Sequence, residues 1–363
     1  METAAERGMA VLDWRAGGLA CARAFLLEHG AETGLVLVFH GDADGCAAAV
    51  ILSETLEQGG APAPLLLPPG KGENCFSPGF RQRLEPLAQA VAVLDMGSRA
   101  EPIVARPLLV VDHHVTEGVP PGAVLVTGYR ELGFCVPTAE LARLVAEGMP
   151  GYNAARAGWL AALGVQADAG GRAPVAALAA ARAAYGTRTL SRAAGLINAA
   201  RRAAAHRVPV GVAALQAAQD PGDLAELRIP EAKQLEAYRQ EVEAETRRVR
   251  HIAPQFAGGV ALLEFSSPCQ VHGLVAASWA RRLADFVVMA ANVGYLPGKV
   301  NFAVRAHRDL DLVALLRDVP FERVEPDEYA HGHRAATGGS LTFASFNRML
   351  AALGFGPEAM VPE

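Results

Sequence analysis

The sequence predicts an α/β protein whose first domain contains a doubly wound, mostly parallel sheet. Five short runs in the first half have the continuous apolar character of strands that are buried on both faces of such a sheet. These runs are residues 35–39, 65–67, 91–94, 108–111 and 124–126. Helix-forming stretches lie between them, most clearly at residues 46–58 and 79–88. Because open α/β sheets bind ligands beyond the carboxyl ends of their strands, the residues that follow each run are the first candidates for a site.

The length of the chain and the order of its later segments predict two domains. A chain of 363 residues is longer than one average domain. Residues 138–218 are rich in alanine and predict helices around the sheet, and a strongly charged stretch after Pro230 predicts an exposed connecting helix with i,i+4 ion pairs. Strand and helix signals resume after Pro254. We therefore expect a first domain over residues 1–228, a connecting helix over 229–255 and a smaller α/β domain over 256–363.

Composition and charge limit the classes of function. The net charge is -5, so the molecule as a whole does not attract polyanions, and any contact with nucleic acid must be local. No apolar run of about 18 residues is present, and the acidic residues Glu2 and Glu6 do not fit a secretory signal. We expect a cytoplasmic protein with no membrane partner. The five cysteines are scattered without a CxxC pair, which predicts reduced, buried thiols.

Three of the predicted strands end in acidic and histidine residues. The clusters are His40, Asp42 and Asp44 after residues 35–39, Asp95 after 91–94, and Asp112, His113 and His114 after 108–111. A lone aspartate after a strand commonly caps a helix or a turn, but three such clusters at one edge of a sheet do not fit that explanation. Carboxylates with imidazoles suit Mn2+, Mg2+ or Fe2+ better than structural zinc. Divalent cations would also neutralise carboxylates that otherwise repel one another.

These motifs are similar to those of the DHH phosphoesterase superfamily. Its members include RecJ-type exonucleases, oligoribonuclease/pAp phosphatases, cyclic dinucleotide phosphodiesterases and family II pyrophosphatases. The fourth motif of the superfamily, an aspartate in a Gly-Ala-Asp context, is matched by residues 164–168, which end at Asp168. The GGH-rich loop of its second (DHHA1) domain is matched by residues 331–339. The resemblance covers essentially the whole chain, with the motifs in the same order.

The resemblance implies a centre of two Mn2+ ions, for which Mg2+ or Co2+ are substitutes. One ion would be held by His40, Asp42 and Asp95, and the other by Asp44, Asp95, His113 and Asp168. Asp112 would orient the imidazole of His113, and His114 would contact the substrate phosphate or assist the leaving group. Water activated by both ions would then attack phosphorus in line.

The second domain is expected to bind the rest of the substrate. The candidates that the resemblance implies there are His331, Gly332, His333, Arg334, Gly338 and Gly339. Arg305, at the end of a predicted strand over residues 300–304, is a secondary candidate for the same anion. An ordinary Gly-rich turn is the alternative. Residues 195–202 resemble the RecJ-type segment Pro-Arg-Leu-Asn-Ala-Ala-Gly-Arg, which grips phosphate. Asn198 and Arg202 match this segment, so the resemblance implies that both contact the substrate, but Leu196 replaces the first arginine and Arg201 replaces the glycine. For these arginines the surface of an amphipathic helix is the alternative.

The resemblance is closer to RecJ-type nucleases than to pyrophosphatases. Because few residues follow 331–339, we do not expect the oligonucleotide-binding domain that full-length RecJ exonucleases append. The acidic charge and an aromatic content of 6% do not fit a long single-strand groove. We therefore predict an exonuclease on short single-stranded oligonucleotides. The alternatives are a cyclic dinucleotide phosphodiesterase or pAp phosphatase, and a non-catalytic nucleic-acid-binding scaffold, against which the complete set of ligands argues. DNA or RNA preference and the oligomeric state, a homodimer included, stay open.

Overall fold

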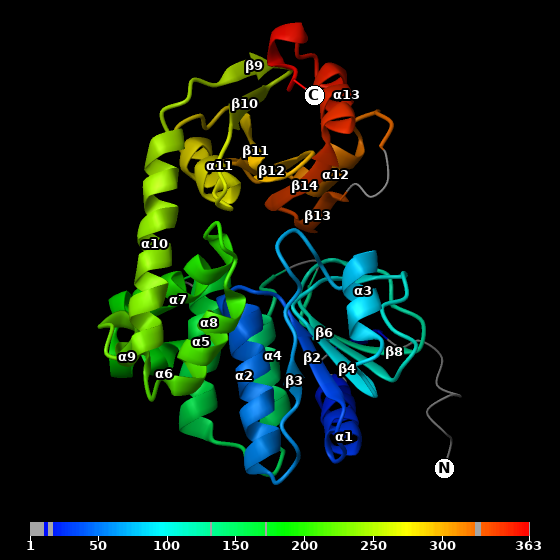
Figure 1. Cartoon of the computed structure of the whole chain (residues 1–363), viewed down its shortest axis with the longest axis vertical. Helices are drawn as coiled ribbons and strands as arrows, with labels where there is room; N and C mark the ends of the chain where they lie inside the picture. Colours follow the sequence, from blue (N-terminus) through cyan, green and yellow to red (C-terminus); the bar gives the residue numbers. More distant parts are fainter. Residues whose placement is uncertain (1–10, 14–16, 131–132, 171–172, 324–327, 363) are drawn as a thin grey trace. The chain divides into compact units, whose positions relative to one another are not determined.

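The structure is a computed structural model, and it describes residues 11–13, 17–130, 133–170, 173–323 and 328–362. The chain divides into two compact units (Figure 1). The first consists of Met1–Arg201 and Ala205–Arg239, and the second of Arg202–Ala204 and Gln240–Glu363. Each unit contains its own six-stranded sheet, and each is described separately below.

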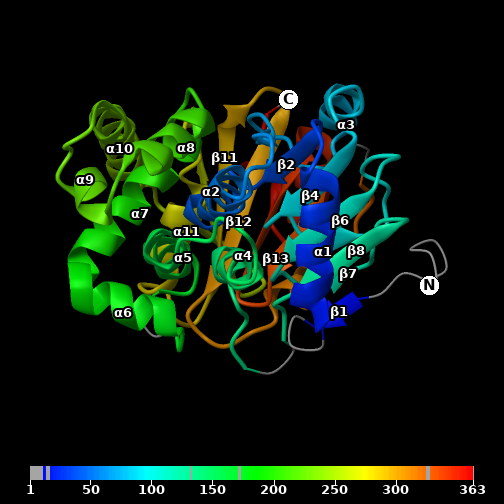
Figure 2. The ribbon, with the colours of Figure 1, turned by 90° about the horizontal axis from the view of Figure 1, so that it is seen from below.

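The first unit contains a sheet in which every described pairing is parallel. Its strand order is β1 (Val11–Asp13), β8 (Ala123–Thr127), β6 (Leu108–Asp112), β4 (Ala90–Leu94), β2 (Leu35–Phe39) and β3 (Leu65–Leu66). Figure 2 shows β2, β4, β6 and β8 next to one another. From β2 the chain goes to β3 on one side and then to β4 on the other, so the strand order reverses between β2 and β4. Ligands bind at such a reversal in open parallel sheets.

Alternate residues of β2 contribute to two different cores. Its five residues are all buried. Leu35, Leu37 and Phe39 belong to the larger core, and Val36 and Val38 belong to the core on the opposite face. Successive side chains of a strand point to opposite faces, so a strand that is apolar at every position needs helices on both. Each fully buried side chain of this size contributes roughly 1.5–3 kcal/mol to folding.

Helices cover both faces of this sheet, as the sequence predicts. The larger core contains residues of α1 (Leu19–Gly30), α2 (Ala43–Gln58), α4 (Thr138–Ala146), α5 (Ala154–Asp168), α7 (Thr187–Arg202) and α8 (Val208–Ala217). The opposite core contains residues of α3 (Pro78–Leu84). The unit also contains β5 (Ser98–Arg99), β7 (Thr116–Glu117), α6 (Ala176–Tyr185) and α9 (Pro221–Ala225). The predicted doubly wound α/β class is confirmed.

The second unit contains a mixed sheet. Its order is β13 (Glu328–His333), β14 (Ala336–Thr342), β12 (Lys299–Ala306), β11 (Val287–Leu296), β10 (Val260–Phe265) and β9 (Gln255–Ala257). The β10–β11 pairing is parallel, and the other described pairings are antiparallel. The helical elements are α11 (His272–Ala280), α12 (Leu312–Arg317), α13 (Phe343–Ala352) and the short 3-10 helix Pro357–Ala359. This unit has the smaller α/β architecture that the sequence predicts.

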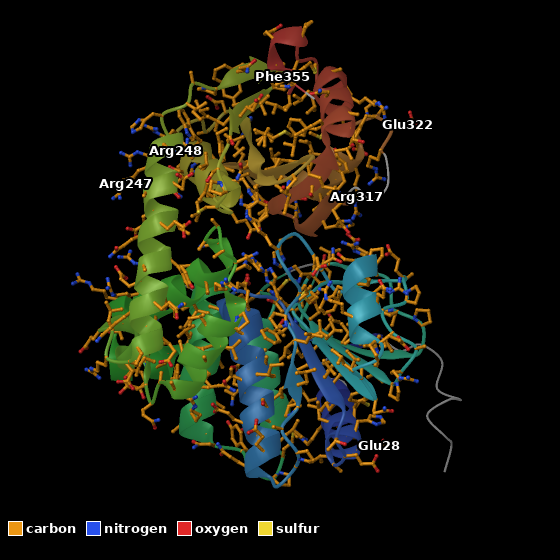
Figure 3. All side chains as sticks on the ribbon, in the orientation of Figure 1. Glu28, Arg247, Arg248, Arg317, Glu322 and Phe355 are labelled. Atoms are coloured by element: carbon orange, nitrogen blue, oxygen red, sulfur yellow. The ribbon has the colours of Figure 1, made fainter. Side chains whose placement is uncertain are left out.

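A long charged helix, α10 (Pro230–Val249), lies within the predicted connecting segment 229–255. The two compact units divide inside it, between Arg239 and Gln240. Its solvated charges form i,i+3 pairs, such as Arg248 with Glu245 at 2.7 Å between Nη2 and Oε2. Figure 3 labels Arg247 and Arg248 at the C-terminal end of this helix. In the part of the chain that the structure describes, no helix has both the length and the apolar character that a membrane crossing requires.

Candidate metal centre

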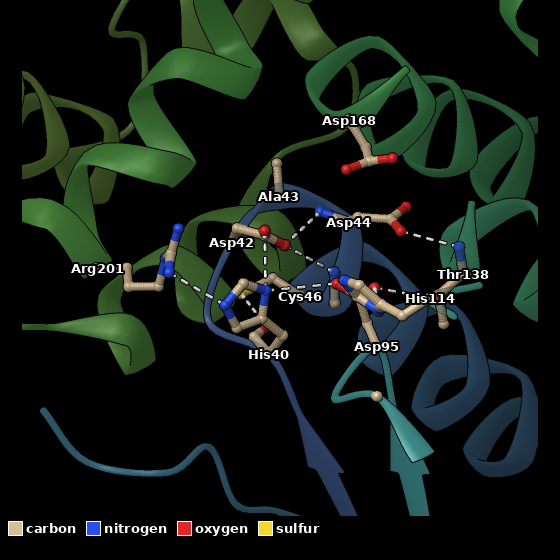
Figure 4. Close-up of polar contacts among 12 residues, drawn as sticks. His40, Asp42, Ala43, Asp44, Cys46, Asp95, His114, Thr138, Asp168 and Arg201 are labelled. Atoms are coloured by element: carbon tan, nitrogen blue, oxygen red, sulfur yellow. Dashed lines mark hydrogen bonds and ion pairs between the residues drawn. The ribbon is translucent and has the colours of Figure 1, made fainter. Parts of the chain in front are cut away.

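The first cluster lies on the turn between β2 and α2. Asp42 is the N-cap of α2, and its Oδ1 accepts hydrogen bonds from the backbone N–H groups of Asp44 at 3.1 Å and Gly45 at 3.2 Å. Its other oxygen, Oδ2, lies 2.9 Å from His40 Nδ1. A Cβ at Gly45 would overlap the carbonyl oxygen of His40, so this turn requires glycine there. The turn therefore holds an imidazole and two carboxylates at the carboxyl end of β2 (Figure 4).

Asp95 lies at the end of β4, between two imidazoles. Its Oδ2 is 3.5 Å from His40 Nδ1, and its Oδ1 is 3.2 Å from His113 Nε2. The side chain is 3% exposed, and the backbone has a positive φ of 63°, which aspartate adopts more readily than most residues. The backbone N–H of Asp95 donates to Val111 O at 3.0 Å. The buried carboxylate of Asp95 thus has one oxygen near His40 and the other near His113.

The N-terminus of α4 holds the carboxylate of Asp44. Asp44 Oδ2 accepts from the backbone N–H of Thr138 at 2.8 Å, and Oδ1 accepts from that of Ala139 at 3.0 Å. The hydroxyl of Thr138 donates to Asp95 Oδ1 at 3.2 Å. Free N–H groups and the helix dipole favour an anion at this position. Thr138 could not be identified from the sequence, because Pro137 before it signals only that a helix starts there.

Helix α5 brings Asp168 to the cluster because Gly164 allows a close approach. Asp168 Oδ2 lies 3.8 Å from His113 Nδ1. Gly164 is one helical turn earlier, on the same face. A Cβ there would lie 2.6 Å from both Asp44 Oδ1 and the Cβ of Ala139. The spacing of the fourth motif therefore has a structural reason. Gly164 lets α5 approach α2 and α4 closely, and Asp168, one turn later, lies on the same face of α5.

Asp112 orients His114 rather than His113, which corrects the predicted pairing. Asp112 Oδ1 accepts from the backbone N–H of His114 at 2.6 Å, and both carboxylate oxygens lie 3.2 Å from His114 Nδ1. Oδ2 also accepts from the N–H of Gly97 at 2.7 Å. The carboxylate of Asp112 is in contact with its next-but-one neighbour because the strand has ended. With Nδ1 engaged by Asp112, Nε2 is the nitrogen through which His114 would act on a substrate.

The electrostatics of the cluster fit the binding of cations. Burial and the neighbouring carboxylate of Asp95 raise the pKa of Asp44 well above its usual range. Burial likewise raises the pKa of Asp168. Although burial opposes a charged imidazole, the carboxylate of Asp95 raises the pKa of His113. Crowded, buried carboxylates cannot all be ionised in the absence of a cation. A divalent cation would stabilise them in the anionic form.

Two of the donor sets that include Asp95 suit a pair of divalent cations, and a third joins Asp95 to Asp112 and His114. The atoms of His40, Asp42 and Asp95 lie within 4.8 Å of one another, and so do those of Asp44, Asp95 and His113. Asp95 belongs to both sets. All the donors are oxygen or imidazole nitrogen, which favours Mn2+ or Mg2+ over a thiolate-bound metal. The residues therefore fit the pair of divalent cations that the sequence predicts. Asp168 lies beside the set of Asp44, Asp95 and His113.

Two side chains of α7 contact the turn between β2 and α2, residues 40–44. Asn198 Oδ1 accepts from the backbone N–H of Ala43 at 2.9 Å. One turn later, Arg201 Nη1 lies 3.0 Å from His40 Nε2 (Figure 4). Asn198 is buried, so in this structure it positions the loop, although the sequence analysis proposed it as a substrate contact. Arg202 ends α7 and belongs to the second unit.

His40 has different neighbours at its two ring nitrogens. Burial disfavours the charged ring, but the carboxylate of Asp42 at Nδ1 raises the pKa of His40 to about 9, and the guanidinium of Arg201 at Nε2 opposes that increase. A guanidinium can only donate. A hydrogen bond at 3.0 Å therefore needs a lone pair on Nε2. The carboxylate of Asp42 at Nδ1 therefore favours the charged ring, and the guanidinium of Arg201 at Nε2 favours the neutral one.

The comparisons with known proteins find relatives only through structure. No family model and no curated protein matches the chain. RecJ from Thermus thermophilus in complex with Mn2+ is 22% identical and aligns with a TM-score of 0.66 over 96% of this chain and 55% of its own. An exonuclease RecJ bound to manganese is 23% identical, with a TM-score of 0.65 over 93% of both chains. CDC45 from Entamoeba histolytica is 9% identical, with a TM-score of 0.56 over 95% of this chain and 99% of its own.

The chain has the fold of RecJ. It spans 55% of the length of the Thermus protein. The resemblance to the DHH superfamily, which the sequence analysis based on motif order, therefore extends to the fold. At these identities the likeness concerns architecture, and the chemistry of the site depends on the residues described above.

In the second unit of this RecJ-like fold, the predicted Gly-rich loop is a β-hairpin. His331, Gly332 and His333 lie on β13, and Gly338 and Gly339 lie on β14. The prediction of a loop was wrong because glycine and histidine carry little strand signal, while pairing with β12 imposes the strand. A Cβ at Gly338 would overlap a carbonyl oxygen of β12, and a Cβ at Gly339 one of β13. Close strand packing accounts for both glycines.

The hairpin places cationic candidates in one row. Arg305 on β12 pairs with Ala336 on β14, which pairs with His333 on β13. Residues in register on adjacent strands point to the same face of a sheet, so Arg305 and His333 share a face. Burial lowers the pKa of Arg305, and its Nη1 donates to Val304 O at 2.8 Å. Arg334 lies in the turn between the two strands, next to this row.

Proposed function

We propose that the chain is a metal-dependent phosphoesterase that hydrolyses phosphodiester bonds of short single-stranded oligonucleotides from one end. The observation that carries this proposal is the pair of donor sets that share the carboxylate of Asp95. They lie where the strand order of the parallel sheet reverses. The RecJ fold supports the same chemistry. Two Mn2+ ions, with Mg2+ or Co2+ as substitutes, would supply an activated water and neutralise charge at phosphorus.

The side chains around the donors have separate roles in this proposal. Asp112 holds His114 at Nδ1 and at its backbone N–H, and the N–H of Gly97 holds the carboxylate of Asp112, which fixes the imidazole beside the cluster. Nε2 of His114 would then bind a phosphate oxygen or donate a proton to the leaving oxygen. Thr138 and the N-terminus of α4 keep Asp44 and Asp95 in place. These contacts limit the movement of the ligand carboxylates.

The choice of a short nucleic acid depends on the distribution of positive charge. The net charge is -5, so attraction of a long polyanion is not expected. The row of Arg305 and His333, with Arg334 beside it, supplies local donors for one or two phosphates of a substrate. Such a limited set of contacts fits a short oligonucleotide better than a long strand.

The proposal is tested by incubating the full chain and Mn2+ with labelled oligonucleotides of graded length, cyclic dinucleotides, pAp and pyrophosphate. Release of mononucleotides from short DNA or RNA is expected, with activity abolished by EDTA and restored better by Mn2+ than by Zn2+. Asp95→Asn is the matched inactive variant, because it keeps the shape of a shared ligand but removes its charge. Binding of Mn2+ without hydrolysis of any phosphoester would contradict the proposal.

Two alternatives make different predictions in the same assay. A cyclic dinucleotide phosphodiesterase or a pAp phosphatase would use the same centre but would leave linear oligonucleotides intact. A non-catalytic nucleic-acid-binding scaffold would bind an oligonucleotide equally well with and without Mn2+. Architecture by itself does not exclude a scaffold, because one fold can carry unrelated functions. The two complete donor sets favour an enzyme, since a scaffold has no need of them.

A further inference from the structure

Helix α4 starts without a capping side chain of its own. Its N-cap residue is Pro137, which makes no side-chain hydrogen bond to the helix. The first N–H groups of a helix need acceptors from outside it. Those of Thr138 and Ala139 donate to the carboxylate of Asp44, which belongs to α2. A candidate metal ligand therefore caps α4 from another helix.

Thr138 makes a second contact with the cluster through its side chain. Its hydroxyl donates to Asp95 Oδ1 at 3.2 Å, while its own N–H donates to Asp44 Oδ2 at 2.8 Å. Thr138 is fully buried, so its hydroxyl must make its hydrogen bond inside the protein. Asp44, Asp95 and His113 form one of the two proposed cation sites, here called the second site. One residue thus contacts both carboxylates of the second site.

The carboxylate of Asp95 needs such a donor to keep its position beside Asp44. Two buried carboxylates repel each other when both are ionised. The other contacts that the described residues make with the Asp95 carboxylate are with imidazoles, such as His40 and His113. These two rings would become ligands of the cations. The hydroxyl of Thr138 is therefore the contact that holds Asp95 without itself being a candidate ligand.

We propose that Thr138 is the positioning residue of the second site, where its N–H and its hydroxyl hold the carboxylates of Asp44 and Asp95 together before a cation binds. The inference rests on the proposed function for the presence of the cations. Each carboxylate oxygen has two lone pairs, so Asp95 Oδ1 can accept from Thr138 and still bind a cation. Thr138 touches neither the cation nor the substrate, and it acts through the two carboxylates.

Titration of the metal-free full chain with Mn2+ by calorimetry tests this role. Thr138→Val keeps the shape of the side chain and the backbone N–H, and it removes the hydroxyl. Without that donor, repulsion turns Asp95 away from Asp44, and the cation has to reverse this movement. We expect Mn2+ binding at the second site to weaken by about 10-fold, as for one hydrogen bond to a charged group. The second site is identified as the one that is lost in His113→Ala. Thr138→Ser keeps the hydroxyl and should restore near-native affinity.

Thr55→Val is the matched control. Thr55 is also buried, about three turns after Asp44 on α2, and its hydroxyl donates to Ile51 O at 2.7 Å. Both valine variants lose one buried hydrogen bond, so the comparison of their thermal stabilities separates a damaged fold from a lost positioning contact. Thr55→Val should bind Mn2+ normally. Equal Mn2+ affinities in the two valine variants would overturn the proposal, and so would a Thr138→Ser variant that binds Mn2+ as weakly as Thr138→Val.

Amide hydrogen exchange of the metal-free native chain tests whether the carboxylate of Asp44 is in place before a cation binds. The N–H groups of Thr138 and Ala139 should exchange slowly without metal, because Asp44 accepts both of them. Rapid exchange that becomes slow only after addition of Mn2+ would overturn the proposal. This measurement uses the native chain, so it decides the question even if Thr138→Val does not fold.

None of these measurements requires turnover, so the two proposals can fail separately. A chain that binds Mn2+ and hydrolyses no phosphoester would lose the proposed function, while the titrations of the Thr138 variants would still give their result. A chain that hydrolyses oligonucleotides, with the same Mn2+ affinity in Thr138→Val as in the native protein, would lose only the positioning role of Thr138.

Discussion

Replacing Gly164 by alanine tests how α5 is held against the metal centre. The added Cβ would lie 2.6 Å from Asp44 Oδ1, 2.6 Å from the Cβ of Ala139 and 3.1 Å from the Cα of Asp44. The Cα and the neighbouring Cβ belong to rigid parts of α2 and α4. The carboxylate of Asp44 must therefore rotate, or α5 must move outward. Either movement disturbs the hydrogen bond from the N–H of Ala139 to Asp44 Oδ1, which is 3.0 Å long.

The size of this effect is estimated from three contributions. Overpacking a buried contact costs about 1–3 kcal/mol. Loss of a hydrogen bond to a charged group costs about 1.5–3 kcal/mol. Alanine in a helix is more stable than glycine by roughly 0.5–1 kcal/mol, which offsets part of the cost. We expect Gly164→Ala to lower the free energy of unfolding of the first unit by roughly 2–5 kcal/mol, and to weaken Mn2+ binding by about 10 to 100-fold through the displaced ligand.

Gly158→Ala is a matched control in the same helix. Nothing lies within 4 Å of a Cβ at Gly158, so this variant should gain about 0.5–1 kcal/mol from helix propensity and bind Mn2+ normally. Urea unfolding in the absence of metal measures stability, and calorimetric titration measures Mn2+ affinity. If Gly164→Ala unfolds like Gly158→Ala and binds Mn2+ with native affinity, the close approach of α5 is not what positions Asp44, and the reasoning fails.

Three further outcomes are expected from the described contacts. Asp112→Asn should lower kcat by about 100-fold and leave Mn2+ affinity nearly native, because Asp112 holds the imidazole of His114. Loss of Mn2+ binding in this variant would show instead that Asp112 is a metal ligand. His333→Ala should reduce kcat/KM for a short oligonucleotide by about 10 to 100-fold and leave kcat/KM for bis-p-nitrophenyl phosphate nearly unchanged. Equal losses on the two substrates would contradict a role of His333 in binding the nucleotide alone. Burial raises the pKa of Cys46 well above its usual range and that of Cys269 to about 12. Neither thiol should therefore react with iodoacetamide before unfolding, and rapid labelling of the native chain would contradict their burial.

The ligand-bearing turns could be predicted because their signals are local. The strands before His40, Asp95 and His113 are continuous apolar runs, and the structure places them at residues 35–39, 90–94 and 108–112. Acidic residues directly after such runs must lie at one edge of a parallel sheet. No knowledge of distant packing is needed for this step. The sequence therefore indicates both the architecture and the residues that could meet.

The contacts that position those residues could not be predicted in the same way. Asp44 accepts N–H groups from Thr138 and Ala139, and Ala43 is held by Asn198. These partners lie about a hundred or more residues away in the chain, and nothing local indicates which helix end will receive which carboxylate. The short strand Val11–Asp13 was also missed, because three residues give no recognisable period.

Three helices determine where the ligand atoms of the first unit lie, and each does so through a contact outside the metal-binding motifs. The N-terminus of α4 fixes the carboxylate of Asp44, α5 comes close because Gly164 has no side chain, and α7 holds the first motif through Asn198. The contacts made by α4 and α7 each hold one carboxylate or one loop, whereas the close approach at Gly164 also belongs to the packing of α5 against α2 and α4. Metal affinity and the stability of the fold are therefore separable at the first two contacts and coupled at Gly164. A substitution that lowers metal affinity without touching a ligand identifies a positioning contact, and a substitution that lowers both properties identifies a contact shared with the core.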